Sequence, residues 1–295
     1  MFFPAAQRVH THSVRRVGEG GFSKMLILGT VLFLALVVLI APLVMIFAEA
    51  FRKGIDAYLT SLVTPDTLHA ILLTVITAII VVPINIGFGL AAAWAVTKFR
   101  FPGRNVLIAL IELPFSVSPI IAGVSYLFVY GAQGLFGPML DELGIKIMFS
   151  LPAIVLASMF VTAPFVAREL IPLMQVQGTD QEEAAMTLGA GGFLTFVRVT
   201  IPNVRWALLY GAILCNARVM GEFGAVSVVS GNVRGVTNTL PLQVQLLYED
   251  YNAVGAFAAA TVLAAIALLT IVIKTYIERN DPQRAEVARR VSPRR

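Results

Sequence analysis

The sequence predicts an all-α membrane protein with six transmembrane helices. Hydrophobic residues make up 58% of the 295 residues, only 13% are charged, and the mean hydropathy is +0.83. An ordinary soluble chain has about 45–50% apolar and about 25% charged residues, so a soluble fold could not cover this much apolar surface. Six apolar segments are also long enough to cross about 30 Å of hydrocarbon at about 1.5 Å per residue.

The predicted spans are separated by short polar stretches. They cover residues 25–47, 71–96, 106–130, 148–166, 206–229 and 253–277. The first follows a basic lead, as a signal peptide does, but its apolar core exceeds the about 7–15 residues of a cleaved signal, so we expect a retained helix. Membrane helices tolerate prolines where neighbouring helices satisfy the freed carbonyls. We expect the middle spans to be broken at Pro83, Pro114, Pro119 and Pro164.

The basic residues predict the orientation. Of the 22 Lys and Arg residues, 17 lie in segments on one side of the predicted spans and four on the other, while Arg218 lies inside a span. The positive-inside rule then places both termini in the cytoplasm, and it accounts for the net charge of +5 without nucleic acid. The predicted divisions are a cytoplasmic N-terminal tail (1–24) without ordered structure, a transmembrane domain (25–277) with a long cytoplasmic loop (168–205), and a basic cytoplasmic C-terminal tail (278–295).

The long cytoplasmic loop has the composition of two short helices joined by glycines. Thr179 or Asp180 can cap a helix whose first turn is acidic, as the helix dipole favours. Gly189, Gly191 and Gly192 end that helix; an amphipathic stretch over 193–199 follows, and Ile201-Pro202 closes the loop. From composition alone, a lever that docks on a soluble partner and a simple connecting loop are both open.

One motif in this loop carries a family resemblance. Glu183-Ala184-Ala185, three residues, Gly189, nine residues, then Val199, Ile201 and Pro202 resemble the Glu-Ala-Ala signature of binding-protein-dependent ABC importer permeases of the type I fold. The motif lies between the fourth and fifth predicted spans, as in that family. The resemblance implies that the loop is the coupling helix that enters a cleft on an ATPase subunit. Its coupling residues would be Glu183, Ala184, Ala185, Gly189 and Pro202, with Glu183 as the anchor and Gly189 at the turn.

Two further stretches resemble one subfamily. Residues 112–119, and residues 218–232 followed by 239–243, are similar to the W-type subunit of sulfate/thiosulfate permeases rather than to its T-type partner. Molybdate and tungstate permeases share the Gly-Glu-Phe-Gly core at 221–224, so the anion stays open. The resemblance implies a bacterial inner-membrane heterodimer with a T-type permease, two ABC ATPase subunits that hold ATP and Mg, and an extracytoplasmic sulfate-binding protein. It implies no cofactor on this chain.

Polar residues inside and after the spans are candidates for the translocation path or gate. Arg218 and Glu222 are four residues apart, so they can pair on one helical face; either they belong to the anion path or they lock span five to its neighbours. Ser116 and Ser118 can face a pore or bond a neighbouring helix. Arg168 and Glu169 are expected at a span end, at the interface. A donor-rich stretch after span five suits an oxyanion or a polar outer loop that touches the binding protein; it includes Ser227, Ser230 and Asn232.

Several other functions lack their motifs. The sequence has no Gly-Lys dipeptide, hence no Walker A loop, so the chain is predicted not to be an enzyme that hydrolyses ATP. The three histidines, His10, His12 and His69, are not expected to form a metal site, and the lone Cys215 is expected to be a buried packing residue. A secondary transporter driven by an ion gradient and a six-span channel remain as alternatives. Dependence on an ATPase partner separates them from an importer.

Overall fold

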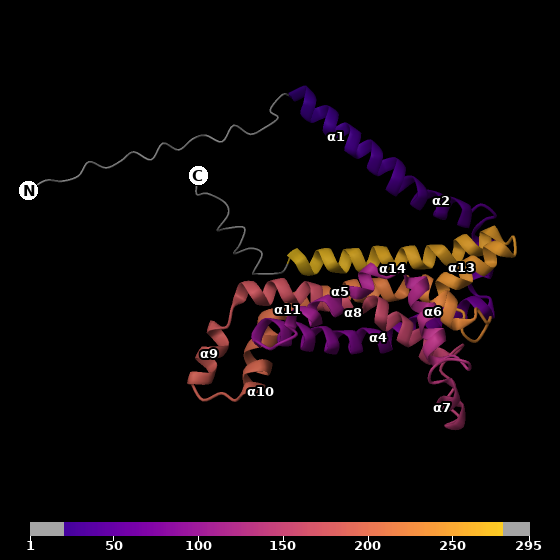
Figure 1. Cartoon of the computed structure of the whole chain (residues 1–295). Helices are drawn as coiled ribbons and strands as arrows, with labels where there is room; N and C mark the ends of the chain where they lie inside the picture. Colours follow the sequence, from indigo (N-terminus) through magenta and orange to yellow (C-terminus); the bar gives the residue numbers. More distant parts are fainter. Residues whose placement is uncertain (1–20, 280–295) are drawn as a thin grey trace, which may run out of the picture. The chain divides into compact units, whose positions relative to one another are not determined.

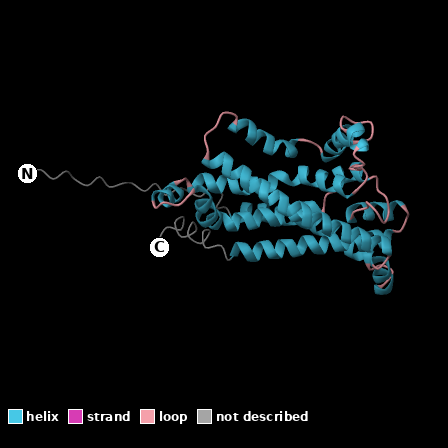
Figure 2. Ribbon diagram, turned by 90° about the horizontal axis from the view of Figure 1, so that it is seen from below, coloured by secondary structure: helices cyan, strands magenta, loops and turns pink. Residues whose placement is uncertain are grey.

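The computed structural model describes residues 21–279, and every element within them is helical (Figure 2). Most of the two predicted tails, 1–24 and 278–295, lies outside these residues. Contacts within the chain divide it into two units, Met1–Met45 and Ile46–Arg295.

The first unit holds a single apolar helical run. It consists of α1 (Gly21–Ala35), a π-helical turn η1 (Leu36–Ile40) and the beginning of α2 (Ala41–Ala50). The run Lys24–Ala50, 27 residues long, is apolar and long enough to cross a membrane, and none of its most apolar window is buried. Predicted span 25–47 is therefore helical throughout.

The second unit is a bundle of long helices with short helices at both ends (Figure 1). Three long helices cross the bundle unbroken, while two further crossings are made by bent pairs. The elements are α3 (Ile55–Leu62), α4 (Pro65–Lys98), α5 (Arg104–Ser116), α6 (Pro119–Tyr130), α7 (Gly137–Glu142), α8 (Leu151–Gln177), α9 (Asp180–Thr187), α10 (Gly192–Thr195), the π-helical η2 (Phe196–Thr200), α11 (Ile201–Met220), α12 (Gly224–Ser230), α13 (Leu240–Glu249) and α14 (Ala253–Arg279).

All six predicted spans correspond to helices or to bent helix pairs. Within the described residues, four helices are long and apolar enough to cross a membrane, and two bent pairs bring the number to six if each pair is one span. Several helices exceed the apolar segment that predicted them: α4 has 34 residues, about 51 Å, against about 30 Å of hydrocarbon. Both ends of α4 are polar, with Asp66 in the first turn and Lys98 in the last, and they extend the helix beyond the apolar run.

The prolines break fewer helices than predicted. Pro83 lies inside α4 and Pro164 inside α8, and both helices continue through them. The break comes at Pro119, where α5 and α6 meet at 109°. Ser118 before it has ψ of 132°, the extended conformation that a following proline favours. α5 likewise continues through Pro114 to Ser116. The expectation of breaks at Pro83, Pro114 and Pro164 is wrong, because packed neighbours hold a proline-containing helix together in a membrane.

The core of the second unit lies between α4, α8 and α11. Val166 of α8 sits between two glycines: a Cβ on Gly89 of α4 would lie 2.6 Å from Val166 Cβ, and one on Gly211 of α11 would lie 3.1 Å from Val166 Cα. Small residues of this kind let membrane helices approach closely. Asn85 adds a polar link, because its Nδ2 donates to Thr162 Oγ1 at 2.7 Å. Cys215, as predicted, is buried in this core.

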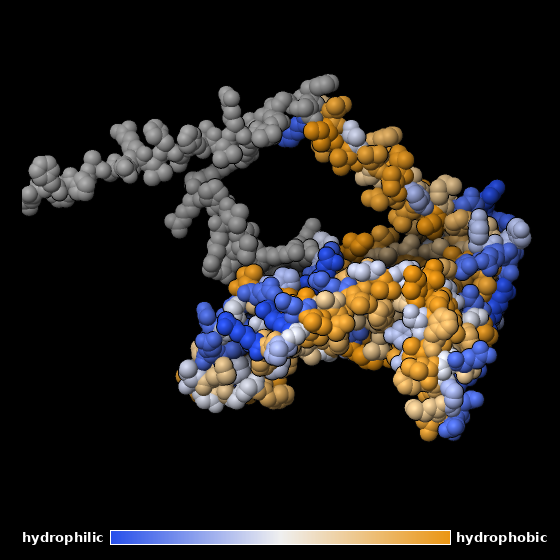
Figure 3. All heavy atoms as spheres, viewed as in Figure 1, coloured by the Kyte–Doolittle hydropathy of each residue, from blue (hydrophilic) through white to orange (hydrophobic). Residues whose placement is uncertain are grey.

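The two ends of the bundle are polar and its middle is apolar (Figure 3). The α9 end carries α9 and α10, and the opposite end carries α6, α7 and α13 (Figure 1). At the opposite end α13 is held to α4, because the Leu240 N–H donates to Thr74 Oγ1 at 2.8 Å. An apolar belt between two polar ends is the surface expected of a protein that crosses a bilayer.

Candidate functional site

The segment with the Glu-Ala-Ala sequence forms a helix of its own, α9, at one end of the bundle. Glu182 and Glu183 lie in its first turn, where the helix dipole favours negative charge. Gly189 has φ of +89°, and the following N–H, of Ala190, bonds the Ala185 carbonyl at 3.0 Å. A glycine in this left-handed conformation closes a helix because it has no Cβ to clash. The turn expected at Gly189 is present.

Side chains attach α9 to two other elements. Lys98, the last residue of α4, places Nζ 2.8 Å from Glu182 Oε1 and also donates to the Gly178 carbonyl. The Thr200 hydroxyl, at the end of η2, donates to the same Glu182 oxygen at 3.2 Å. Neither Lys98 nor Glu182 was singled out from the sequence. Lys98 belongs to a short basic stretch that topology alone explains, and the pairing depends on a fold that joins residues 84 positions apart.

The helices on both sides of α9 extend into the predicted loop 168–205. α8 continues to Gln177, and a continuous helix resumes at Gly192 and runs to Met220. Ile201-Pro202 therefore does not interrupt the helix before the fifth predicted span. Pro202 lies inside that helix, directly after the wide turn η2, in which the Ile201 N–H bonds the Phe196 carbonyl. Such a turn accommodates a residue that lacks an N–H and would otherwise interrupt the bonding pattern.

The outer face of α9 and its flanks is open. Glu183 and Ala184 are exposed and Ala185 is half-buried; Glu183 accepts a hydrogen bond from the Thr179 hydroxyl at 2.7 Å. Apolar side chains stand beside them, with Leu188 89% and Phe193 82% exposed. Large exposed apolar side chains grouped on a polar segment are typical of a protein-binding surface.

The two bent pairs meet at their breaks. α6 begins at Pro119 and α12 at Gly224, and a Cβ on Gly224 would lie 3.0 Å from Pro119 Cβ. One turn on, a Cβ on Gly123 would lie 2.8 Å from the Ala225 carbonyl oxygen. This contact puts both breaks at a similar depth, and Ser116 lies about 18 Å along α5 from Arg104. The structure thus brings together two segments, 112–119 and 218–232, that the sequence offered as separate candidates.

Arg218 and Glu222 form the predicted pair. Arg218 Nη1 lies 2.7 Å from Glu222 Oε2, and the Glu222 side chain is 1% exposed against 34% for Arg218. The expectation that both lie on one helix is wrong, because α11 ends at Met220 and Glu222 lies in the break. The other carboxylate oxygen, Oε1, accepts the Ala225 N–H at 3.0 Å. Glu222 therefore both neutralises Arg218 and binds an otherwise unpaired N–H in the first turn of α12.

The other predicted path residues divide into two groups. Ser116 and Ser118, on either side of the α5–α6 break, are exposed. Ser227 is half-buried and its hydroxyl donates to the Gly224 carbonyl at 2.9 Å. Ser230 is buried, its Oγ donates to Asn232 Oδ1 at 3.3 Å, and the Asn232 N–H donates back to Ser230 Oγ at 3.2 Å. The last two polar side chains thus stabilise the turn after α12.

Arg168 and Glu169 lie inside α8, which extends to Gln177, beyond the predicted span 148–166. Arg168 is exposed, and its guanidinium carbon stands 5.1 Å from the centroid of the Phe115 ring. Within residues 21–279 no carboxylate lies within ion-pair distance of it. Phe115 directly precedes Ser116, so the aromatic side chain places this cation beside the α5–α6 break.

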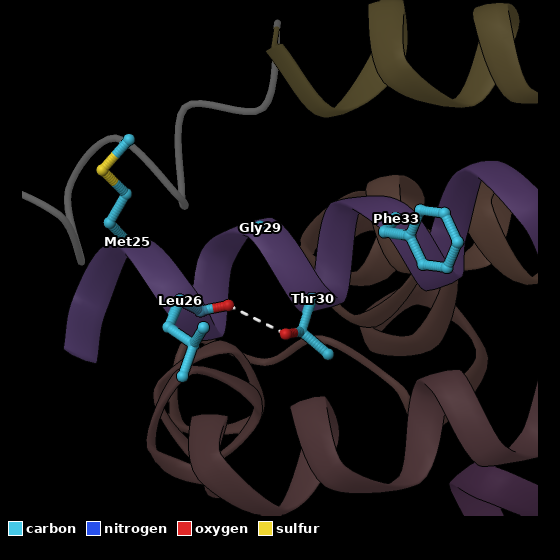
Figure 4. Close-up of a pocket in the computed structure, with 5 residues that line it drawn as sticks. All are labelled: Met25, Leu26, Gly29, Thr30 and Phe33. Atoms are coloured by element: carbon cyan, nitrogen blue, oxygen red, sulfur yellow. Dashed lines mark hydrogen bonds between the residues drawn. The ribbon is translucent and has the colours of Figure 1, made fainter. Parts of the chain in front are cut away.

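Two hollows on the surface lack the chemistry of an anion site. One, of about 360 Å³, lies between α11 and α14 and is lined by apolar side chains such as Ala217, Met220 and Leu263. The other, of about 480 Å³, lies along α1 from Met25 to Phe33 (Figure 4). The hydroxyl of Thr30 there donates to the carbonyl of Leu26 in its own helix at 2.9 Å. Neither hollow presents a charged group.

Comparison with known proteins identifies the family to which this chain belongs. Residues 85–280 match the family described as binding-protein-dependent transport system inner membrane component. The chain belongs to this family. The permease is 50% identical over 268 residues to the sulfate transport system permease protein CysW of Escherichia coli (strain K12), covering 90% of this chain and 92% of that one. It is 32% identical to CysT of the same organism, covering 83% and 88%.

A solved structure supports the fold independently. The permease superposes on a chain of the bacterial alginate ABC transporter in complex with alginate pentasaccharide-bound periplasmic protein, with a TM-score of 0.73 at 17% identity. The match covers 88% of this chain and 94% of that one. The predicted all-α ABC permease fold is thereby confirmed, and so are its multi-pass inner-membrane location and its role as the membrane component rather than the ATPase. A transport system of this kind includes a binding protein and an ATPase.

Proposed function

We propose that this permease forms half of the translocation path of an ATP-driven sulfate/thiosulfate importer. The proposal rests on the difference in sequence identity: the chain is 50% identical to the sulfate permease CysW and 32% identical to CysT. The same contrast assigns this chain the W-type role. Molybdate or tungstate, which related permeases carry, is the alternative anion.

The proposal includes a specific set of partners. A T-type permease provides the second half of the path, two ABC ATPase subunits bind ATP with Mg, and an extracytoplasmic sulfate-binding protein delivers the anion. The CysT relative supports a second permease of the same family as the partner. This chain itself is proposed to need no cofactor.

The geometry suits alternating access. The open face of α9, with Glu183 and Ala184 outward, is proposed to dock on the ATPase. Arg168, Ser116 and Ser118 are exposed on helices inside the membrane, where an unpaired charge facing lipid costs about 2.5–3.5 kcal/mol. Such groups face protein or water, so we place the anion path along this surface, opposite the second permease. An exposed guanidinium and hydroxyl donors suit a dianionic oxyanion.

Uptake in proteoliposomes tests the substrate. The permease, the T-type partner and the ATPase are reconstituted together, and labelled sulfate uptake is followed with and without ATP and binding protein. We expect uptake that requires both and that excess thiosulfate suppresses. ATP-dependent uptake of molybdate but not sulfate would keep the architecture and change the anion. Uptake by this chain alone on an ion gradient would contradict the importer.

Glu183→Ala tests docking. The exposed carboxylate has only Thr179 as a hydrogen-bond partner among the described residues, so its loss should leave the fold intact and weaken the contact with the ATPase. We expect ATPase co-purification and uptake to fall together by about tenfold, the range of a typical coupling energy. Unchanged docking and uptake would refute the anchoring role of Glu183.

A further inference from the structure

The joint between α8 and α9 is held from outside by a residue of another helix. Gly178, with φ of +66°, connects the two helices, and Gly189, with φ of +89°, follows α9. Lys98 of α4 donates to the Gly178 carbonyl and pairs with Glu182 at 2.8 Å. It therefore binds both sides of the joint, one through the backbone and one through a carboxylate.

The contacts are enclosed. The Lys98 side chain is 8% exposed and that of Glu182 14%, while Thr200, which also donates to Glu182, is 2% exposed. Water screens exposed ion pairs and makes them weak, whereas enclosed and hydrogen-bonded pairs hold a defined geometry. Lys98 also stands at the C-terminus of α4, where the helix dipole favours a cation.

A second link runs beside the first. Gln177 Nε2 donates to the Asn203 carbonyl at 3.2 Å, and Asn203 Nδ2 donates to Gln181 Oε1. This link ties the end of α8 and the start of α9 to α11. Together the two links connect α9 to α4 and α11, although the chain itself connects it only through glycine joints.

We propose that Lys98, Glu182 and Thr200 form a brace that passes displacement of α9 to α4 and α11. This inference rests on the proposed importer function. Without the brace, a force on α9 would be absorbed by rotation at Gly178 and Gly189, because glycine backbones turn freely. With the brace, α9 moves as one body with the ends of α4 and α11. The three residues are positioning residues, and they touch neither anion nor nucleotide.

Two adjacent carboxylates, Glu182 and Glu183, allow the role of the brace to be tested separately from docking on the ATPase. Glu182 points into the bundle end and Glu183 points outward. Loss of the Glu183 charge should weaken ATPase binding, whereas loss of the Glu182 charge should leave binding intact and reduce the transport obtained from each ATP. The ratio of uptake to ATP hydrolysis is a quantity that a purely docking role would not change.

The test uses the full complex with Lys98→Met, Glu182→Gln and the double variant. We expect normal ATPase co-purification and hydrolysis, uptake per ATP lower by about fivefold or more, and a double variant no worse than either single one, because both remove one interaction. Lys98→Arg, which keeps the charge, should restore the ratio, and Lys53→Met, an exposed lysine elsewhere, should not change it. An unchanged ratio, additive effects, or parallel loss of the ATPase subunit would each overturn the proposal.

A second measurement does not depend on the substrate. In the purified permease, amide hydrogen exchange over residues 178–190 should accelerate by about tenfold in Lys98→Met, with no change in α13, because local opening controls exchange. If the wild-type complex carries no sulfate, the proposed function fails while this readout still tests the brace. Unchanged exchange would show that Lys98 does not hold the joint, whatever the permease carries.

Discussion

Glu222 contacts two groups, Arg218 and the Ala225 N–H. The effect of mutating Arg218 on stability therefore depends on what replaces Glu222. One carboxylate oxygen lies 2.7 Å from Arg218 and the other accepts the Ala225 N–H. Arg218→Met leaves a buried charge without a counter-ion, which costs about 3–5 kcal/mol. Arg218→Met with Glu222→Gln removes the charge and keeps an oxygen for the N–H. We expect the double variant to recover thermal stability in detergent, whereas Arg218→Met with Glu222→Ala should not.

Uptake by the same variants decides the role of Arg218. If uptake returns together with stability in Arg218→Met/Glu222→Gln, Arg218 serves charge compensation alone. If stability returns and uptake stays low, its cation belongs to the anion path. Equal stability of the Gln and Ala double variants would contradict the capping role of Glu222.

The sequence predicts a local contact between two residues more readily than the structure around that contact. The spacing of Arg218 and Glu222 predicted their contact, since residues four positions apart lie about one helical turn apart. It could not show that α11 ends between them, because the Gly221-Glu222-Phe223-Gly224 break depends on packing of α12 against α6. Lys98 and Glu182 lie too far apart in sequence for any local pattern to pair them. The stacking of Arg168 on Phe115 joins two helices and has the same origin.

At the scale of elements, α9 ends because Gly189 adopts a left-handed backbone. Gly189 and Gly191 both have open space where a Cβ would be, but only Gly189 has positive φ. Gly189→Ala should therefore cost about 1–2 kcal/mol of local stability through the backbone alone, and Gly191→Ala should be neutral. Hydrogen exchange across α9 in the two variants measures the difference. Equal exchange would show that the turn does not depend on glycine.

The contact between α6 and α12 depends on a glycine for a different reason. A Cβ on Gly123 would lie 2.8 Å from the Ala225 carbonyl oxygen, whereas one on Gly221 would come no closer than 3.6 Å to the Ala217 oxygen. Gly123→Ala should lower stability by about 1–3 kcal/mol through overpacking, while Gly221→Ala should lie within about 0.5 kcal/mol of the wild type. Thermal unfolding of the purified permease checks both. A tolerated Gly123→Ala would mean that the two helices separate easily.

The sequence predicted which segments are helical better than it predicted where the helices begin and end. Long apolar runs predicted all six helices or bent helix pairs, because hydrocarbon requires helices of a minimum length. The runs could not show where the helices end, since α4 and α8 continue through polar residues and prolines held by their neighbours. For the same reason helices extend into the predicted loop 168–205 from both sides. Tertiary packing, which a local pattern does not contain, decides these limits.

At the scale of the whole molecule, the charge distribution predicts which side of the membrane each end of the bundle faces. With 17 of 22 basic residues on the side of both termini, the α9 end should face the cytoplasm. Leu188 beside α9 is 89% exposed, and Leu143 beside α7, at the opposite end, is 62% exposed. Leu188→Cys and Leu143→Cys therefore place reporters on the two sides. The native Cys215 is 0% exposed and should stay unlabelled.

A membrane-impermeant maleimide should label Leu143→Cys in intact cells and Leu188→Cys in inverted vesicles. The reverse pattern would place α9 on the side without ATP, where no ATPase could reach Glu183, and the coupling proposal would fail with the topology. Labelling of both variants from one side would mean that α8, the candidate spanning helix between Leu143 and Leu188, does not cross the membrane. The expected pattern places α9, its brace and the basic segments on the same side as the energy source.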